Sequence, residues 1–249
     1  MKYNRPLNPK PNPPETNQMK TLIIIPAYNE SESIEIVVNN LTANYPQYDY
    51  VVVNDGSKDK TAEICLNNNY NMIDLPVNIG LSGGVQSGMK YAYRNDYDYA
   101  IQFDGDGQHD PQYISRMLEE IEENNLDFVI GSRFIAEKKT YSLRMIGSNI
   151  IQLVIKITTG KTIKDPTSGM RMYNRKLIEI MANSLDFGPE PDTIALLLRS
   201  GAKFKEIPVT MNNRIAGVSY LNAASSIVYM ARIVTSLVFM QWFRKKPNF

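Results

Sequence analysis

The sequence predicts an α/β protein built on a doubly wound, mainly parallel sheet. Apolar runs short enough for buried strands alternate five times with segments whose apolar residues recur at helical spacing. No connection between them carries the short turn signal of a hairpin, so we expect the strands to lie parallel. Polar clusters follow the strands at 26–30, 54–57 and 104–110. Ligands of such sheets bind outside the carboxyl ends of the strands, so these clusters should converge.

The first 131 residues contain the regular part of this pattern. Buried strands are expected at 21–25, 50–53, 70–75, 97–103 and 126–131. Helices are expected between them at 31–41, 57–66, 79–94 and 111–125, the first capped by Ser31 or Ser33 and the last begun by Pro111 in its first turn.

After residue 131 the alternation loosens. The pattern predicts an amphipathic helix over 142–160, a loop followed by a strand over 165–173, a helix over 191–201, a strand over 203–211 and a strongly apolar helix over 225–246. No internal repeat and no second domain boundary is visible.

Composition excludes several classes of function. The formal net charge is +1, so nothing global favours nucleic acid as a partner. The single cysteine, Cys65, excludes an internal disulfide framework and fits a reducing compartment.

The stretch FDGDGQHD at 103–110 places three carboxylates and the only histidine of the chain at the end of a buried strand. An EF-hand is excluded, because loop position six would be His109 and position twelve Ser115. Carboxylates packed so closely repel one another unless a cation neutralises them. The pattern therefore indicates a magnesium or manganese site that shares its ion with a diphosphate. We interpret His109 as a polar neighbour of this site rather than a ligand.

Seven motifs stand in the order and spacing of a known family: IIIPAYNE, VVVNDGSKDKT, NIGLSGGVQSG, FDGDGQHDP, GSR, DPTSGMR and RIAGVS. With them the chain resembles the family 2 inverting glycosyltransferases, and among these the dolichol- and polyprenyl-phosphate sugar synthases. The resemblance covers residues 19–220. It implies a GT-A fold, a nucleotide-sugar donor, and Mg²⁺ or Mn²⁺ held by the acidic motif.

On the donor side, the resemblance implies roles for residues in four motifs. The nucleotide-sugar would contact Pro26, Tyr28, Glu30, Asp55, Gly83, Asp104 and Gln108. The metal would be held by Asp104 and Asp106. Asn54 stands where the family often has another Asp, a difference that bears on the choice of base.

On the acceptor side, the resemblance implies a phosphate bound by Arg133, Arg144, Arg214 and Ser219. The residues expected to act in catalysis are Asp106, Arg133, Arg214 and Asp165, although Asp165 could equally shape the acceptor loop. Tyr220 follows Ser219 where family members often have Lys.

The chemistry leaves two classes of acceptor open. A phosphate monoester is largely ionised at neutral pH, since its second pKa is about 6, and needs arginines rather than a base. A sugar hydroxyl would need a carboxylate base, for which Asp165, Glu190 and Asp192 are available.

We therefore expect transfer of a hexose or N-acetylhexosamine from a UDP-sugar, with a GDP-sugar as alternative, to polyprenyl phosphate. The alternatives are transfer to a saccharide hydroxyl in cell-wall polysaccharide synthesis, a non-catalytic nucleotide-sugar-binding subunit of a membrane synthase, and a nucleotidyltransferase. A lipid acceptor implies that the protein binds a membrane surface, as a peripheral protein on the cytoplasmic face of the cell membrane. Further expected partners are a small membrane protein or a second copy of this chain.

The domain prediction follows from these expectations. Residues 1–18 hold five prolines and no apolar core, and should form a disordered extension. Residues 19–220 should form the GT-A catalytic domain, and 221–249 a membrane-interface or oligomerisation helix. Its apolar run from Ser225 to Phe243 has Arg232 inside it, which favours lying in the interface over spanning the bilayer.

Overall fold

The computed structural model describes residues 2–3, 19–135, 143–184, 187–215, 223–239, 242–244 and 246–247. The chain divides into two compact units. The first comprises residues 1–111, 172–188 and 212–217, and the second comprises residues 112–171, 189–211 and 218–249. Both are assembled from non-contiguous segments, so no linker in the sequence marks their boundaries.

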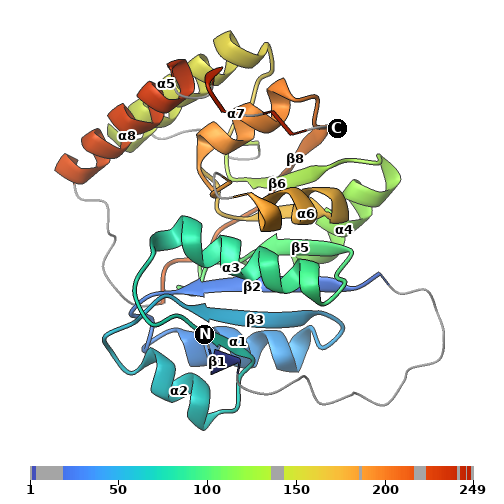
Figure 1. Ribbon diagram of the computed structural model, residues 1–249, viewed down its shortest axis with the longest axis vertical. Coiled ribbons are helices and arrows are strands. Elements are labelled where there is room, and N and C mark those ends of the chain that lie inside the picture. Colours follow the sequence, from blue (N-terminus) through green and yellow to red (C-terminus); the bar gives the residue numbers. More distant parts are fainter. Residues whose placement is uncertain are drawn as a thin grey trace. The chain divides into compact units, whose positions relative to one another are not determined.

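The first unit is a mainly parallel sheet of strands in the order β1-β4-β3-β2-β5-β7 (Figure 1). These are β1 (Lys2–Tyr3), β2 (Thr21–Ala27), β3 (Asp49–Asn54), β4 (Met72–Asp74), β5 (Tyr99–Gln102) and β7 (Arg171–Asn174). In the centre of the sheet, β2 runs parallel to β3 on one side and to β5 on the other. Ile24 of β2 lies opposite Val51 of β3 and Gln102 of β5. Strand β1 runs antiparallel to β4.

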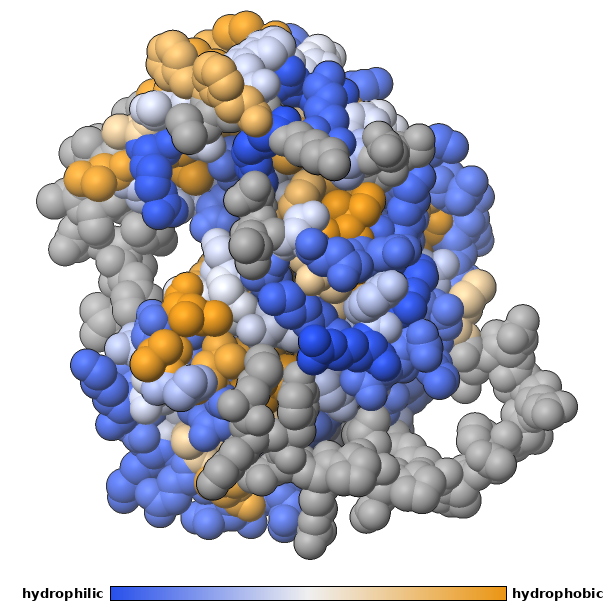
Figure 2. Space-filling model, viewed as in Figure 1, coloured by the Kyte–Doolittle hydropathy of each residue, from blue (hydrophilic) through white to orange (hydrophobic). Residues whose placement is uncertain are grey.

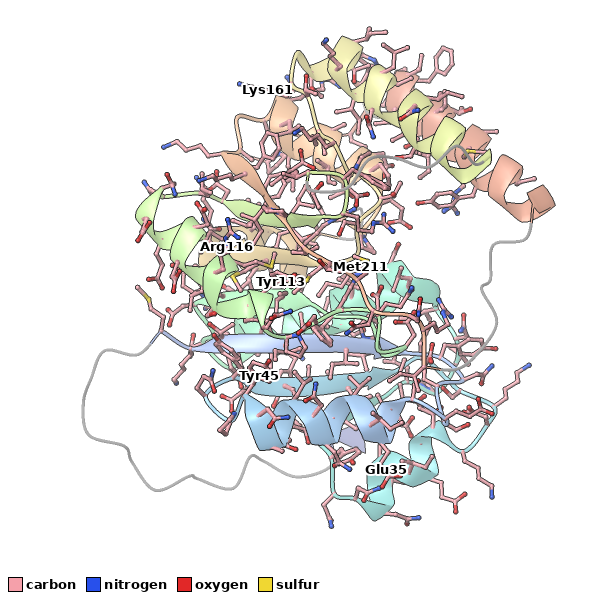
Figure 3. The ribbon with its side chains drawn as sticks, turned by 180° about the vertical axis from the view of Figure 1, so that it is seen from behind. Glu35, Tyr45, Tyr113, Arg116, Lys161 and Met211 are labelled. Atoms are coloured by element: carbon pink, nitrogen blue, oxygen red, sulfur yellow. The ribbon has the colours of Figure 1, made fainter. Side chains whose placement is uncertain are left out.

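The helices of this unit are α1 (Ile34–Asn44), α2 (Thr61–Asn67), α3 (Gly80–Arg94) and α6 (Arg175–Asn183). Helix α1 ends at its C-cap Tyr45 (Figure 3). Helix α3 packs closely on β2, since a Cβ added at Gly88 would lie 2.2 Å from Cγ2 of the fully buried Ile24. Glycine is required there by the close approach of helix and sheet.

The described residues of the second unit form a parallel pair of strands and four helices. Strand β6 (Phe128–Ser132) pairs with β8 (Phe204–Pro208), with Gly131 opposite Ile207. Its helices are α4 (Tyr113–Glu123), α5 (Leu143–Thr159), α7 (Pro191–Arg199) and α8 (Ala223–Val238). Helices α5 and α8 lie side by side (Figure 1). The hydroxyl of Tyr113 accepts a hydrogen bond from the Thr210 N–H (3.1 Å), which fastens α4 to the segment after β8 (Figure 3).

The predicted parallel α/β sheet is confirmed, with three differences of detail. Helix α6 was not expected; it begins at Asn174, whose side chain accepts from the Leu177 N–H. Helix α4 has Gln112 as N-cap, so Pro111 precedes the helix instead of lying in its first turn. Helix α8 ends at Val238, well before residue 246. Of the expected disordered extension, Lys2 and Tyr3 form a short strand, and residues 4–18 lie outside the described part.

We expect Gly88→Ala to destabilise the protein and Gly83→Ala to leave it nearly unchanged. The new methyl group at 88 meets buried Ile24, and overpacking of this kind costs about 1–3 kcal/mol. At 83 it meets the end of the half-exposed Ile79 side chain, which can move, and alanine gains up to about 1 kcal/mol of helix propensity. Urea unfolding of both variants tests this, and equal losses would contradict it.

Candidate active site

The loops after β2, β3 and β5 come together in the first unit, as the sequence predicted. The Asn29 N–H donates to Ser57 Oγ (3.0 Å), and Asn29 Oδ1 accepts from the Lys58 N–H (2.8 Å). A Cβ at Gly105 would lie 3.3 Å from the Pro26 carbonyl oxygen. The three polar clusters therefore share one edge of the sheet.

Asp106 is buried and both of its carboxylate oxygens have partners. Oδ1 accepts from the Gln108 N–H (3.0 Å), and Oδ2 pairs with Arg214 Nη2 (2.9 Å). The segment around Arg214 is held by two backbone bonds to the acidic loop, Asn212 N–H to Gln108 O (2.9 Å) and Ile215 N–H to Asp106 O (3.0 Å). Arg214 is thus fixed beside the acidic motif by main chain as well as by charge.

His109 organises the same loop from inside the protein. Its Nδ1 accepts from the Asp104 N–H (2.9 Å), so the ring proton of the neutral imidazole lies on Nε2, which is 3.5 Å from Asp104 Oδ2. The ring packs edge-on against Phe103 with centroids 5.4 Å apart. This geometry agrees with the interpretation of His109 as a neighbour that positions Asp104.

Glu30 adds a third carboxylate to this neighbourhood. Burial raises its pKa, as do the charges of Asp106 and Asp104, while the hydrogen bond from Ser33 Oγ (2.8 Å) and the charge of Arg214 lower it. Glu30, the two aspartates and Arg214 therefore act on one another electrostatically.

The oxygen donors at this edge fit a hard divalent cation. Within the described part of the chain, no group of three or more acidic, histidine or cysteine side chains is placed to hold a metal ion. Asp104 and Asp106 supply two carboxylates in this loop, and Mg²⁺ commonly takes one or two carboxylates and its other ligands from water and substrate phosphates. His109 accepts from the Asp104 main chain and lies near its carboxylate, and Arg214 pairs with the Asp106 carboxylate, as outer partners commonly do around metal ligands.

Asp55 is buried where β3 ends and binds the start of α3. Its Oδ1 accepts from the Ile79 N–H (2.8 Å), and the Gly80 N–H is a second donor. Burial raises the pKa of Asp55, and these two bonds lower it. The carboxylate thereby caps the N-terminus of α3, which begins against Pro26: a Cβ at Gly84 would lie 3.7 Å from the Pro26 Cβ.

The acceptor-side residues that the structure describes lie in the second unit, except Arg214. Arg133 makes a two-pronged pair with Asp165, from Nε to Oδ2 (2.7 Å) and from Nη2 to Oδ1 (2.8 Å). The Arg133 N–H also donates to Asp165 Oδ2 (3.2 Å), and Thr167 Oγ1 donates to Oδ1 (3.2 Å). The Asp165 side chain is 0% exposed, whereas that of Arg133 is 34% exposed. Asp165 is therefore enclosed, and Arg133 reaches solvent.

The other two acids that the sequence left open as bases contact the C-terminal part of the chain. Asp192 Oδ2 accepts from Ser236 Oγ of α8 (2.5 Å) and lies 3.4 Å from Arg244 Nη1. Glu190 Oε1 is 3.9 Å from Arg232 Nη2, also on α8. Both acids therefore face cations or donors of the C-terminal segment.

Two predicted residues cannot be placed. Arg144 lies in the first turn of α5, but its side chain, like the whole of Ser219, lies outside the described residues. Sequence reasoning also missed Glu206 and left Arg171 without a role. The only signal for Glu206 was a charged residue inside a predicted strand.

The fold resembles that of solved glycosyltransferases of the GT-A class. The structure of glucosyl-3-phosphoglycerate synthase from Mycobacterium tuberculosis with Mn²⁺, UDP and phosphoglyceric acid superimposes with a TM-score of 0.68 at 16% identity, covering 90% of this chain and 79% of that one. The fold predicted from the sequence is thus confirmed as GT-A-like.

The sequence comparisons identify the family. The profile of glycosyl transferase family 2 matches residues 22–181, and the chain belongs to this family and is a glycosyltransferase. It is 30% identical to undecaprenyl-phosphate mannosyltransferase of Micrococcus luteus, over 82% of this chain and 88% of that protein. It is 27% identical to polyprenol monophosphomannose synthase of Mycolicibacterium smegmatis, over 83% and 82%. It is 31% identical to UDP-N-acetylglucosamine–dolichyl-phosphate N-acetylglucosaminyltransferase of Methanococcus voltae, over 66% and 72%.

We expect Asp165→Asn to lower the free energy of unfolding by about 2–4 kcal/mol, because an amide N–H₂ would then face the donors of Arg133 in a buried place. Asp96→Asn is the control. Asp96 also pairs with an arginine, Arg175 (3.1 Å), but is 83% exposed, and exposed pairs contribute about 0–1 kcal/mol. Urea unfolding compares them; equal effects would argue against a structural role for the Arg133–Asp165 pair.

Proposed function

We propose that this chain is an inverting, metal-dependent glycosyltransferase that moves a hexose or N-acetylhexosamine from a UDP-sugar to polyprenyl phosphate, the undecaprenyl form in bacteria. Its relatives are named for transfer to polyprenol, undecaprenyl phosphate and dolichyl phosphate. Their donor sugars differ, with mannose in two names and N-acetylglucosamine in the third, so the class of acceptor is better supported than the sugar.

The observation that supports the proposal is the burial and the bonding partners of the three carboxylates that could act as a base. Asp165 is enclosed and held by Arg133, Asp192 is held by Ser236 and faces Arg244, and Glu190 faces Arg232. A general base needs an oxygen that can reach the hydroxyl it deprotonates, and Asp165, which is enclosed, has both oxygens bonded to Arg133. A phosphate acceptor needs no base, since it arrives ionised. The arginine pairing therefore favours a phosphate over a hydroxyl.

On the donor side, the residues of the first unit have separable roles. Asp104 and Asp106 would hold the cation, which when bound would supply positive charge to the departing diphosphate. Arg214, fixed beside Asp106, adds a donor for the charge that develops there. Pro26, Tyr28, Glu30, Asp55, Gly83 and Gln108 line the nucleotide-sugar, in the roles that the family resemblance assigns. UDP is preferred over GDP in this proposal, although one carboxylate at the base, Asp55, can serve either.

On the acceptor side Arg133 binds the phosphate. The family resemblance adds Arg144 and Ser219 as further contacts. Arginine suits this task because its planar fork can donate to Asp165 and to a phosphate from different edges.

We expect wild-type protein with Mg²⁺ or Mn²⁺ to transfer labelled sugar from a panel of UDP- and GDP-sugars to short-chain polyprenyl phosphate, giving an acid-labile lipid. Asp106→Ala and Arg214→Ala should each lower kcat by about 100-fold or more, because each removes charge stabilisation from the leaving group. Glu63→Gln, on the exposed side of α2, should match wild type. The proposal fails if the label reaches a saccharide hydroxyl and never the lipid phosphate.

The rival acceptor also has a signature in the pH dependence. A carboxylate base would give kcat/KM an acidic limb that disappears when that carboxylate is replaced. Under the proposal the acidic limb follows ionisation of the acceptor phosphate, near pH 6, and persists in Asp192→Asn.

A lipid acceptor requires a surface that meets the bilayer, and α5 and α8 are suited to it. Ile150, Leu153 and Ile157 recur at helical spacing on α5 and are exposed, as are Val228 of α8 and Phe239, Trp242 and Phe243 beyond it. Figure 2 shows apolar side chains gathered over these helices. Exposed basic residues lie on or just after the same helices: Lys156 on α5, Lys161 after it, and Arg232 on α8. Within the described residues, no helix is long and apolar enough to span a membrane. An apolar face with basic residues beside it is typical of binding in the interface.

We therefore expect the double variant Leu153→Glu/Ile157→Glu to lose about 10-fold or more of its affinity for vesicles that contain anionic lipid, since two exposed apolar side chains could no longer enter the interface. Leu66→Glu, which changes a 49% exposed leucine on α2, is the control. Co-sedimentation measures binding; unchanged binding of the double variant would remove this surface from the proposal. Placement on the cytoplasmic face, a small membrane partner and self-association stay predictions.

A further inference from the structure

Glu206 of β8 holds the backbone of the loop that carries Asp165. Its Oε2 accepts from the Lys164 N–H (2.8 Å) and its Oε1 from the Asp165 N–H (2.9 Å). One carboxylate bound to two successive N–H groups fixes the orientation of the peptide between them, because both oxygens must stay in the plane of the carboxylate. The direction in which the Asp165 side chain leaves the backbone is thereby set by Glu206.

This arrangement places two carboxylates next to each other in the second unit. Burial raises the pKa of Glu206, the bonds from Lys164 and Asp165 lower it, and the charge of Asp165 raises it. The two acids divide the available donors between them: Glu206 takes main-chain N–H groups, and Asp165 takes the guanidinium of Arg133. Neighbouring carboxylates are unfavourable unless each has its own donors.

The same loop is anchored at two further points. Arg171, 1% exposed, donates from Nη2 to the Pro166 carbonyl (2.8 Å) and from Nη1 to the Pro189 carbonyl (2.6 Å). Ser168 Oγ donates to the Gly131 carbonyl on β6 (2.6 Å). The loop is therefore already tied to β6 and to the segment before α7. Glu206 contributes something that these anchors do not, a direct hold on the peptide of Asp165.

We propose that Glu206 is a positioning residue: by holding the Lys164–Asp165 peptide it aims the Asp165 carboxylate at both donor positions of Arg133, and so sets the guanidinium that binds the acceptor phosphate. The inference rests on the proposed function for the identity of the acceptor. Glu206 bonds the Lys164 and Asp165 N–H groups, and the Asp165 carboxylate, carried by the same main chain, bonds Arg133.

A double-mutant cycle separates positioning from a general structural role. Glu206→Gln keeps the shape but turns one oxygen into an N–H₂ that faces a main-chain N–H. We expect it to lower kcat/KM for short-chain polyprenyl phosphate by about 10- to 100-fold, chiefly through the acceptor KM, since small misplacements of a binding group have effects of this size. In an Arg133→Gln background the same change should add less than about 2-fold, because coupled residues are not additive.

The controls test the specificity of the effect. UDP binding, measured by calorimetry with Mn²⁺ present, should stay within about 2-fold of wild type in every variant, since the donor residues lie in the other unit. Lys205→Met changes the neighbouring residue of β8, whose Nζ contacts Glu120 Oε2 (2.5 Å), and should leave kcat/KM unchanged. Glu206→Asp, which cannot reach both N–H groups without movement, replaces Glu206→Gln if that variant is unfolded at 25 °C.

Each outcome decides the proposal. Equal losses from Glu206→Gln with and without Arg133, or a parallel loss of UDP binding, would overturn the positioning role. If both Glu206 variants unfold, Glu206 is structural and the proposal is equally overturned. If wild-type protein transfers no sugar to the lipid phosphate, the proposed function fails separately, and the same cycle is measured on the acceptor that wild type does use; additivity there overturns the inference as well.

Discussion

The structure depends on how a chain of almost no net charge accommodates carboxylates at the ends of its strands. Parallel strands deliver their following residues to one edge of a sheet, so acids from distant parts of the sequence become neighbours. Burying such groups is unfavourable unless each gains donors or an opposite charge. In the first unit Asp55 gains the first N–H groups of α3 and Asp106 gains Arg214. In the second unit Asp165, in the loop after α5, gains Arg133. Every one of these bonds also fixes a residue with an expected role.

The two arginine pairs differ in a way that matches different tasks. Both oxygens of the enclosed Asp165 accept hydrogen bonds from Arg133, so this pair holds the guanidinium in a fixed orientation. Asp106 meets Arg214 through one oxygen and a backbone N–H through the other, and each oxygen keeps a second lone pair. A carboxylate of the second kind can still coordinate a cation, whereas one of the first kind serves mainly to orient its partner.

The regular elements could be predicted from the sequence because their signals are local. A run such as TLIII between polar residues specifies a buried strand without knowledge of its neighbours, and Gly80 with its following apolar positions specifies the start of α3. Helix α6 was missed because nine residues make a short window, although its buried residues Leu177, Ile178, Met181 and Ala182 recur at helical spacing and Asn174 was a readable cap. The acidic motif could be read from the sequence because its residues are adjacent in the chain, so its signal is local as well.

The partners of those residues could not be read, because they are set by the fold. Arg133 and Asp165 are 32 residues apart, and Glu206 bonds a loop 41 and 42 residues before it. Nothing in the spacing distinguishes an aspartate that will accept a proton from one that will be enclosed by an arginine, which is why Asp165 remained open between the two roles. The burial that the fold provides favours the second role. A general base must exchange a proton with its substrate, whereas the Asp165 side chain is 0% exposed and is bonded twice to the Arg133 guanidinium. On the proposed function, the negative charge of Asp165 acts through Arg133, whose guanidinium it holds in one orientation. A phosphate that binds there meets donors that folding has already ordered, so binding loses less conformational entropy. This preorganisation is the physical reason to expect an ionised acceptor at Arg133.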